Sequence, residues 1–461
     1  MNVSNNIKNE ILVTNFKYFI FAFEFFEMML YFGNVSILVL YSIKKYNFNE
    51  LASLHLLGLY ISLFCITPII SGYLSDKYLN DHIGIKIGTL FLILSCIFLS
   101  FSQIDLFYLG IIFNIIGAGF YKSIFSKLIG TIETNNIENN YKQFYLVLNV
   151  GAFIGAILFS FISDINYFIY FYIASACSIF LLYRRFFNNK NYKQILDNYS
   201  LNSKSFYIAL TFIIFIMGLY FMLFELMNII DLTSYLISAG IAILMFFFIK
   251  YKINCNVLFY FIVGVIFFQS SLQIGGLVTL FIYKNFQFIL LGYKLNTMFF
   301  TSLNPLLIIF FSKYTTIIRE EKKVIFSLVC CLLFFLCLDL TMFYHSNNYV
   351  NFTLIIVALC FISYGEILIA PLILDKMNHY AFEIPSAIMG IFYFSQSLAV
   401  YLGEKFNKYF LKVSGAGSIN MNINRDDFKR IFLSYMVLLF VSIISLYIIK
   451  KSNHFRLRIF N

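Results

Sequence analysis

Residues 21–33 read FAFEFFEMMLYFG and place two carboxylates, Glu24 and Glu27, inside an apolar run long enough to cross a membrane. An ionisable side chain at bilayer depth costs about 2.5–3.5 kcal/mol on insertion scales, so it usually faces a protein interior or a water-filled path. The spacing of three residues puts both carboxylates on one face of a helix. A structural tie to a basic neighbour would explain one acid, whereas two acids on one face favour a functional role.

The composition of the whole chain is that of a membrane protein. Of its 461 residues, 61% are hydrophobic and 12% are charged, whereas a soluble domain carries about 25% charged residues. We expect an all-α polytopic protein with fourteen membrane-spanning helices, near residues 16–43, 50–76, 83–103, 105–132, 141–163, 166–187, 205–227, 229–250, 256–284, 295–314, 322–345, 350–376, 384–411 and 427–450.

These helices fall into a six, two, six arrangement. It predicts an N-terminal six-helix bundle (1–187), a basic cytoplasmic loop with an inserted helix pair (188–254), and a C-terminal six-helix bundle (255–461). The first apolar run is too long for the core of a signal peptide, so we expect it to remain as the first helix.

Lysine and arginine are distributed unevenly over the predicted loops. The loops on the side of the N-terminus hold about twice as many as the others, which places both termini in the cytoplasm. The same residues supply much of the net charge of +11. Anionic lipid headgroups are therefore sufficient partners, and nucleic-acid binding is not indicated. The expected location is the plasma membrane, which is the inner membrane if the source is a bacterium.

The sequence lacks the constellations expected of an enzyme. Its 5 histidines are scattered over loops and helix ends, and its 8 cysteines lie mostly inside predicted helices without metal-ligand spacing. No nucleophile, base and orienting acid fall together, and no glycine-rich phosphate cradle is present. We therefore expect no enzymatic activity, no metal and no cofactor, and energy from an ion gradient.

A lone cation lies inside the fourth predicted helix. Lys122 follows small residues that allow another helix to approach closely. A buried lysine requires an acid, and Glu24 and Glu27 are its expected partners. Lys127 lies nearer the inner end of the same helix and is expected to extend toward the interface.

Together the polar positions resemble the signature of the proton-dependent oligopeptide transporter (POT) family of the major facilitator superfamily. In the first half the matching residues are Glu24-Phe-Phe-Glu27 with Tyr31 and Gly33, Thr67-Pro68, Gly117-x-Gly119-x-x-Lys122, and Phe144-Tyr145-x-x-x-Asn149-x-Gly151. In the second half they are Gln273, Ser302-Leu303-Asn304-Pro305, Gly365-Glu366 with Pro371, and Met389-Gly390. The resemblance covers most of the chain, and prokaryotic members also carry a helix pair between the halves.

The resemblance implies the major facilitator fold and proton-coupled import of di- and tripeptides by alternating access. Glu24, Glu27 and Lys122 would serve in proton coupling and gating. The implied substrate-binding residues are Tyr31, Lys122, Tyr145, Asn149, Gln273, Asn304 and Glu366, with Glu366 as the counter-charge of the peptide amino terminus. Asp76 and Lys77 would form a cytoplasmic conformational lock. The implied partners are a short peptide, protons and membrane lipids, and we expect a monomer.

The chain departs from the family pattern at two arginine positions, where it has Met28 and Val35. Three acids, Glu24, Glu27 and Glu366, then face only Lys122, and such a cluster is costly to keep fully ionised in a low-dielectric cavity. We expect Glu24 and Glu27 to share a proton near neutral pH and to titrate as a unit.

Two alternatives remain open at this point. The missing arginines are compatible with a transporter of the same fold whose cargo is an amine-bearing or peptide-like molecule without a carboxylate. A receptor that keeps the fold without transporting is the second alternative, against which the retention of all four charged residues argues.

Overall fold

The computed structural model describes residues 2–48, 50–101, 103–132, 137–161, 168–188, 192, 203–226, 232–290, 293–294, 297–344, 348–380, 383–413 and 425–451. Eleven helices within these residues are long and apolar enough to cross a membrane. The chain divides into two compact units, the first made of Met1–Ile253 and Leu374–Ser397, the second of Asn254–Ile373 and Leu398–Asn461.

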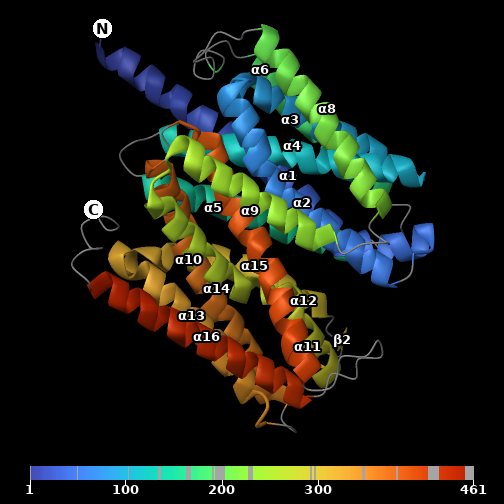
Figure 1. The fold of residues 1–461 in the computed structure, drawn as a ribbon, viewed down its shortest axis with the longest axis vertical. Coiled ribbons are helices and arrows are strands. Elements are labelled where there is room, and N and C mark those ends of the chain that lie inside the picture. The colour runs from blue at the N-terminus through green and yellow to red at the C-terminus, as the bar shows by residue number, and fades with distance from the viewer. Residues whose placement is uncertain are drawn as a thin grey trace. The chain divides into compact units, whose positions relative to one another are not determined.

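Among the residues that the structure describes, the first unit contains eight helices and a segment from late in the chain. The helices are α1 (Asn2–Tyr46), α2 (Glu50–Lys77), α3 (Asp81–Leu99), α4 (Ile104–Ile132), α5 (Ile137–Phe161), α6 (Phe168–Phe187), α8 (Ser203–Leu226) and α9 (Leu232–Tyr251). Helix α3 packs along α4 (Figure 1), and α1 packs along α5. A Cβ atom at Gly151 of α5 would lie 2.6 Å from the carbonyl oxygen of Phe25 in α1, so glycine is needed for this close packing.

The inserted pair α8–α9 is tied to α2 by hydroxyl groups. Pro68 interrupts the backbone hydrogen bonding of α2 because it has no N–H group. Beside it, the Thr67 hydroxyl donates to the carbonyl oxygen of Leu63 (2.6 Å) and also pairs with the Tyr220 hydroxyl of α8 (2.8 Å). The Tyr251 hydroxyl of α9 donates to that of Tyr73 (3.1 Å). The buried hydroxyl groups of Thr67 and Tyr220 thus satisfy each other inside the first unit.

The first unit is completed by the end of α14 (Asn348–His379) and the first half of α15 (Pro385–Val413). A Cβ atom at Gly72 of α2 would lie 2.6 Å from the backbone carbonyl carbon of Ser386. Only a residue without a side chain allows the end of α2 and the start of α15 to pack this closely.

The second unit contains the helices that follow α9, except for the parts of α14 and α15 that belong to the first unit. It is built from α10 (Cys255–Ser271), the 3₁₀ turn η2 (Leu272–Gly275), α11 (Leu277–Asn285), α12 (Thr297–Phe311), the 3₁₀ turn η3 (Ser312–Ile317), α13 (Glu320–Leu340), α16 (Arg425–Lys451) and the other parts of α14 and α15. Helices α13 and α16 lie side by side (Figure 1). A short antiparallel hairpin pairs β1 (Ile289–Leu290) with β2 (Tyr293–Lys294).

Apart from the short hairpin β1–β2, the expected all-α membrane architecture is confirmed, with one correction to the predicted helices. The helix expected near 256–284 is broken, because α10 ends at Ser271 and α11 begins only at Leu277. Gly275 and Gly276 lie in the break, and each glycine costs about 1 kcal/mol relative to alanine inside a helix. The division of the chain into two six-helix bundles and an inserted helix pair stays a prediction. The two compact units are defined by contacts between residues, and the first unit includes Leu374–Ser397 from late in the chain.

Candidate functional site

Two buried carboxylates and one buried ammonium group form a charged cluster in the first unit, made of Glu24, Glu27 and Lys122. The three residues are 0%, 1% and 3% exposed. The Nζ atom of Lys122 lies 3.4 Å from Oε2 of Glu27. Within the described part of the chain, none of the four carboxylate oxygens accepts a hydrogen bond. Glu24 is therefore the less satisfied of the two acids.

The other neighbours of the Lys122 ammonium group are weakly polar. Its Nζ donates to Sδ of Met28 (3.2 Å) and lies 4.9 Å from the ring centres of both Phe64 and Tyr393. Met28 thus supplies a weak acceptor where the family pattern has a second cation. Two carboxylates face one ammonium group, so the charged cluster is neutral when the two carboxyl groups together hold one proton.

The predicted substrate residue Tyr31 lies beside the charged cluster. It is half-buried, and its ring stacks on Phe64 with centres 3.7 Å apart and planes 14° apart. Glu24, Glu27, Tyr31 and Asn34 follow one another at intervals of three or four residues, so they lie along one face of α1.

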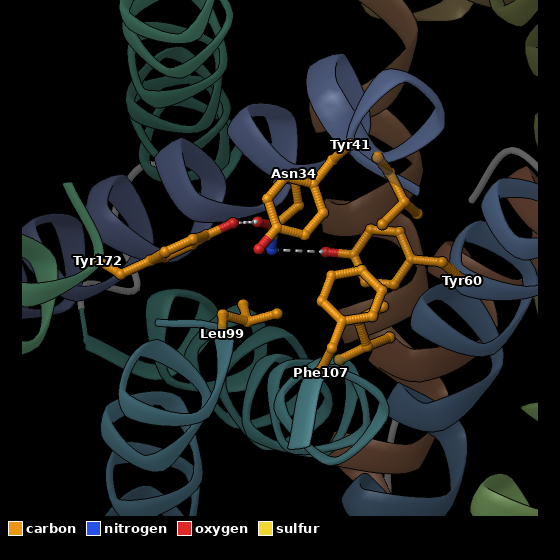
Figure 2. Close-up of a pocket in the computed structure, with 8 residues that line it drawn as sticks. Asn34, Tyr41, Tyr60, Leu99, Phe107 and Tyr172 are labelled. Atoms are coloured by element: carbon orange, nitrogen blue, oxygen red, sulfur yellow. Dashed lines mark hydrogen bonds between the residues drawn. The ribbon is translucent and has the colours of Figure 1, made fainter. Parts of the chain in front are cut away.

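A small cavity lies at the Asn34 end of this face (Figure 2). The Tyr172 hydroxyl donates to Oδ1 of Asn34 (2.7 Å), and Nδ2 of Asn34 donates to the Tyr60 hydroxyl (3.4 Å). Tyr60 in turn donates to Oδ1 of Asn114 (2.8 Å). About 10 Å³ is open to the centre of a water molecule, which is room for about one water and far too little for a peptide. The hydrogen bonds join α1, α2, α4 and α6.

Tyr145 and Asn149 lie on α5 as predicted, one turn apart and both buried. Nδ2 of Asn149 donates to the backbone carbonyl oxygen of Tyr145 (2.8 Å). The amide nitrogen is thus used within its own helix, and the amide oxygen is the atom of Asn149 suited to accept a hydrogen bond from a ligand.

The second unit brings Glu366 and Asn304 together. Nδ2 of Asn304 in α12 donates to Oε2 of Glu366 in α14 (3.3 Å), and Glu366 is 8% exposed. The Ser363 hydroxyl donates to Oδ1 of Asn304 (2.6 Å) and so fixes which side of the amide faces the acid. Ser363 was not among the predicted site residues, although it lies one turn before Glu366 on α14.

Gln273, predicted to bind substrate, lies in the break between α10 and α11. Its Nε2 atom donates to the carbonyl oxygen of Gln269 (3.1 Å), and its Oε1 atom accepts a hydrogen bond from Asn407 (2.8 Å). The Tyr435 hydroxyl donates to Oδ1 of Asn407 (3.2 Å). The Nε2 atom of Gln273 thus holds the break to α10, whereas its Oε1 atom links the break to α15, and through Asn407 to α16. Contact of Gln273 with a substrate stays a prediction.

Asp76 and Lys77, which were predicted to form a cytoplasmic lock, contact different groups, and their role as a lock stays a prediction. Asp76 accepts a hydrogen bond from the backbone N–H of Ala387 (3.0 Å) in the first turn of α15 and lies 3.6 Å from Nζ of Lys127. Lys127 also pairs with Asp81 at the start of α3. Lys77 instead lies 3.9 Å from Glu383, which is largely exposed. Lys127 is thus a partner of two acids, where the sequence predicted a side chain extended toward the interface.

Comparison with known proteins agrees with this architecture. No protein-family model matches the chain. A dipeptide and tripeptide permease A from Edwardsiella piscicida is 28% identical over 162 residues, which cover 33% of this chain and 33% of the permease. The chain thus spans about a third of the length of the curated relatives it matches.

Solved structures match over nearly the whole chain. Tetrameric PepTSo2 has a TM-score of 0.71 at 16% identity, with 95% of this chain and 98% of that chain covered. A POT family transporter in complex with a thioalcohol-conjugated peptide has a TM-score of 0.73 at 16% identity, with 95% and 96% covered. The fold is that of POT family transporters, and the resemblance predicted from the motifs is confirmed.

Proposed function

We propose that this chain is a proton-coupled symporter that imports di- and tripeptides across the plasma membrane by alternating access. The observation that carries the proposal is the charged cluster of Glu24, Glu27 and Lys122, which is buried and needs one bound proton to be neutral. A site of this kind in a polytopic membrane protein is suited to proton transfer. The curated relatives are named dipeptide and tripeptide permeases, which supports the substrate class.

The residues proposed for peptide recognition are those that the motif resemblance implies. Glu366, oriented by Asn304, supplies the negative charge for the peptide amino terminus, and the amide oxygen of Asn149 is a further acceptor. Lys122 is the cation proposed for the peptide carboxylate. It is held by Glu27 in this structure, so protonation of Glu27 would make its charge available.

The transport cycle draws its energy from the proton gradient, without a metal or cofactor. Asp76 and Lys127 are proposed to hold the first turn of α15 in one conformation of the cycle. Both termini are assigned to the cytoplasm and the working form to a monomer. The relatives carry the names of permeases, and no observation favours an enzyme, a receptor or a cargo without a carboxylate.

Uptake of labelled dialanine into proteoliposomes, with and without an inward proton gradient, tests the proposal. We expect accumulation that depends on the gradient and is competed by unlabelled dipeptides. Liposomes with protein carrying both Glu24→Gln and Glu27→Gln are the matched control and should not accumulate peptide. Absence of uptake by folded, inserted wild-type protein would overturn the assignment.

A further inference from the structure

Tyr393 on α15 contacts the charged cluster from a segment more than 250 residues away in sequence from Lys122. Its side chain is 3% exposed, and its ring centre lies 4.9 Å from Nζ of Lys122. Its hydroxyl pairs with Oγ of Ser126 (2.9 Å), which is one turn after Lys122 on α4. One aromatic side chain therefore touches two successive positions on the same face of α4.

The hydroxyl end of Tyr393 is itself held in place. The Tyr141 hydroxyl of α5 donates to the backbone carbonyl oxygen of Ser126 (2.8 Å) and lies 3.8 Å from Sδ of Met389, one turn before Tyr393. These contacts fix where the ring lies over the ammonium group. Ionisable groups of several helices share this region, namely Glu24 and Glu27 of α1, Tyr60 and Cys65 of α2, Tyr121 of α4, Tyr141 of α5 and Asp375 of α14.

The position of Tyr393 matters because Lys122 has few partners. Glu27 is its ion-pair partner within the described residues, and the other contacts are a thioether and two aromatic rings. A ring that faces a desolvated cation attracts it more strongly than one at an exposed site. Of the two rings, Phe64 belongs to α2, whereas Tyr393 comes from the α15 segment that joins the first unit.

The bound proton and the packed segment depend on each other. Residues 385–397 contact the charged cluster through Tyr393. With one proton on the two carboxyl groups, the net charge of the cluster is zero. Loss of that proton leaves one buried negative charge, which is costly unless water reaches it. Separation of the segment from α4 would open the charged cluster to water and would also remove the ring from Lys122. By linkage, each event favours the other.

We propose that Tyr393 is a positioning residue that holds Lys122 against Glu27 and thereby couples proton release from the charged cluster to separation of residues 385–397 from α4. The consequence of this coupling for peptide transport rests on the proposed function. The coupling itself is a property of the protein without substrate. The two parts can therefore be tested separately.

The first test uses the absence of tryptophan from the sequence. Tyr393→Trp keeps an aromatic face over Lys122 and introduces the sole indole of the chain. We expect its fluorescence in purified protein to change with pH in one transition, and Glu27→Gln to remove that transition. An emission that does not respond to pH, or a transition that persists unchanged with Glu27→Gln, would overturn the coupling. No substrate is needed, so this result stands whether or not the chain carries peptides.

The second test separates the ring from the hydroxyl by transport of dialanine in proteoliposomes. Tyr393→Phe keeps the ring, and Tyr393→Leu removes it. Tyr220→Phe is the matched control, because it deletes a buried tyrosine hydroxyl that pairs with Thr67 and lies outside the charged cluster. We expect Tyr393→Leu to lower gradient-driven accumulation by about tenfold, with exchange in the absence of a gradient retained. Tyr393→Phe and Tyr220→Phe should accumulate peptide nearly as wild type does.

The outcomes are distinguishable. Equal accumulation by Tyr393→Leu and wild type, or equal losses with Tyr393→Leu and Tyr393→Phe, would show that the ring does not couple the two events. If Tyr393→Leu fails to fold, the indole titration still decides the question. If wild type takes up no peptide while the indole transition depends on Glu27, the proposed function fails and the coupling stands.

Discussion

At the scale of single residues, the two acids of α1 have different surroundings despite their spacing of three. Glu27 faces Lys122 at 3.4 Å, whereas Glu24 is fully buried and neither of its oxygens accepts a hydrogen bond from the described residues. Removing the charge of Glu27 leaves an ammonium group without its ion-pair partner. Removing the charge of Glu24 takes away no contact of that kind. Substitutions at the two positions should therefore have different effects on the stability of the protein, although both carboxylates are proposed to bind the proton.

Glu27→Gln should lower the free energy of unfolding by about 3–5 kcal/mol, because one partner of a buried ion pair is removed. Glu24→Gln should leave the melting temperature close to that of wild type. The combination Glu27→Gln with Lys122→Met is the matched control and should recover most of the loss, because no charge is then left alone. Thermal unfolding of purified protein in detergent measures all three. Equal melting temperatures for Glu27→Gln and wild type would show that the ion pair contributes nothing.

Glu366→Gln should abolish uptake of peptides with a free amino terminus, because the amide cannot offset the charge of an ammonium group. Ser363→Ala should act more mildly, since Ser363 contacts Asn304 and not the acid. We expect the serine variant to raise KM without lowering kcat. Competition by N-acetylated dialanine provides the comparison. If Glu366→Gln transports dialanine as wild type does, Glu366 does not bind the peptide.

At the scale of elements, the decisive contact is that between the end of α2 and the start of α15. Gly72 lets the two backbones meet, and Asp76 accepts a hydrogen bond from the first turn of α15 one turn later. Because a carboxylate near the N-terminus of a helix is also stabilised by the helix dipole, charge and close packing act on the same turn.

Gly72→Ala should destabilise the protein, because its Cβ would lie 2.6 Å from backbone atoms that cannot move aside as a side chain can. Overpacking of this kind costs about 1–3 kcal/mol. Gly218→Ala in α8 is the matched control, since nothing lies within 4 Å of a Cβ there. It should raise stability by up to about 1 kcal/mol through helix propensity. Melting temperatures decide between them, and a Gly72→Ala protein as stable as Gly218→Ala would contradict the close packing.

Asp76→Asn should weaken the hold on α15 more than Lys77→Gln does. The asparagine oxygen still accepts from Ala387, but the attraction to Lys127 is lost. Lys77 pairs with an exposed acid, and such pairs contribute about 0–1 kcal/mol. Rates of dialanine uptake and melting temperatures of both variants test this ranking. A larger effect of Lys77→Gln would favour Asp76 and Lys77 as the lock over Asp76 and Lys127.

At the scale of the whole molecule, apolar runs and turn residues located the helices, and helical spacing placed Glu24 and Glu27 on one face. Charge balance then indicated Lys122 as their neighbour. The partners of Lys127 and the approach of Tyr393 could not be predicted in this way, because they join segments far apart in the sequence and neither spacing nor composition encodes such pairs. The break at residues 272–276 was missed because its glycines lie in a continuous apolar stretch.

The predicted topology makes the two ends of the chain accessible from the same side. A tag at either terminus should be cleaved by protease in inside-out vesicles and protected in right-side-out vesicles. A tag inserted between α13 and α14, which the even helix count places outside, is the control and should show the opposite pattern. Termini protected in different vesicle types would mean an odd number of spans.

The composition of the first unit also has a consequence for biosynthesis. Asn34 obtains its hydrogen bond from Tyr172 only after 138 further residues have been made. The same unit includes Leu374–Ser397, so its last pieces leave the ribosome when most of the chain has already been inserted. Until then Tyr393 is not yet present beside the charged cluster of α1 and α4, and the backbone N–H of Ala387, from which Asp76 accepts a hydrogen bond, has not yet been made. The nascent protein must therefore hold charged residues in the membrane for most of its synthesis before the helices that shield them arrive.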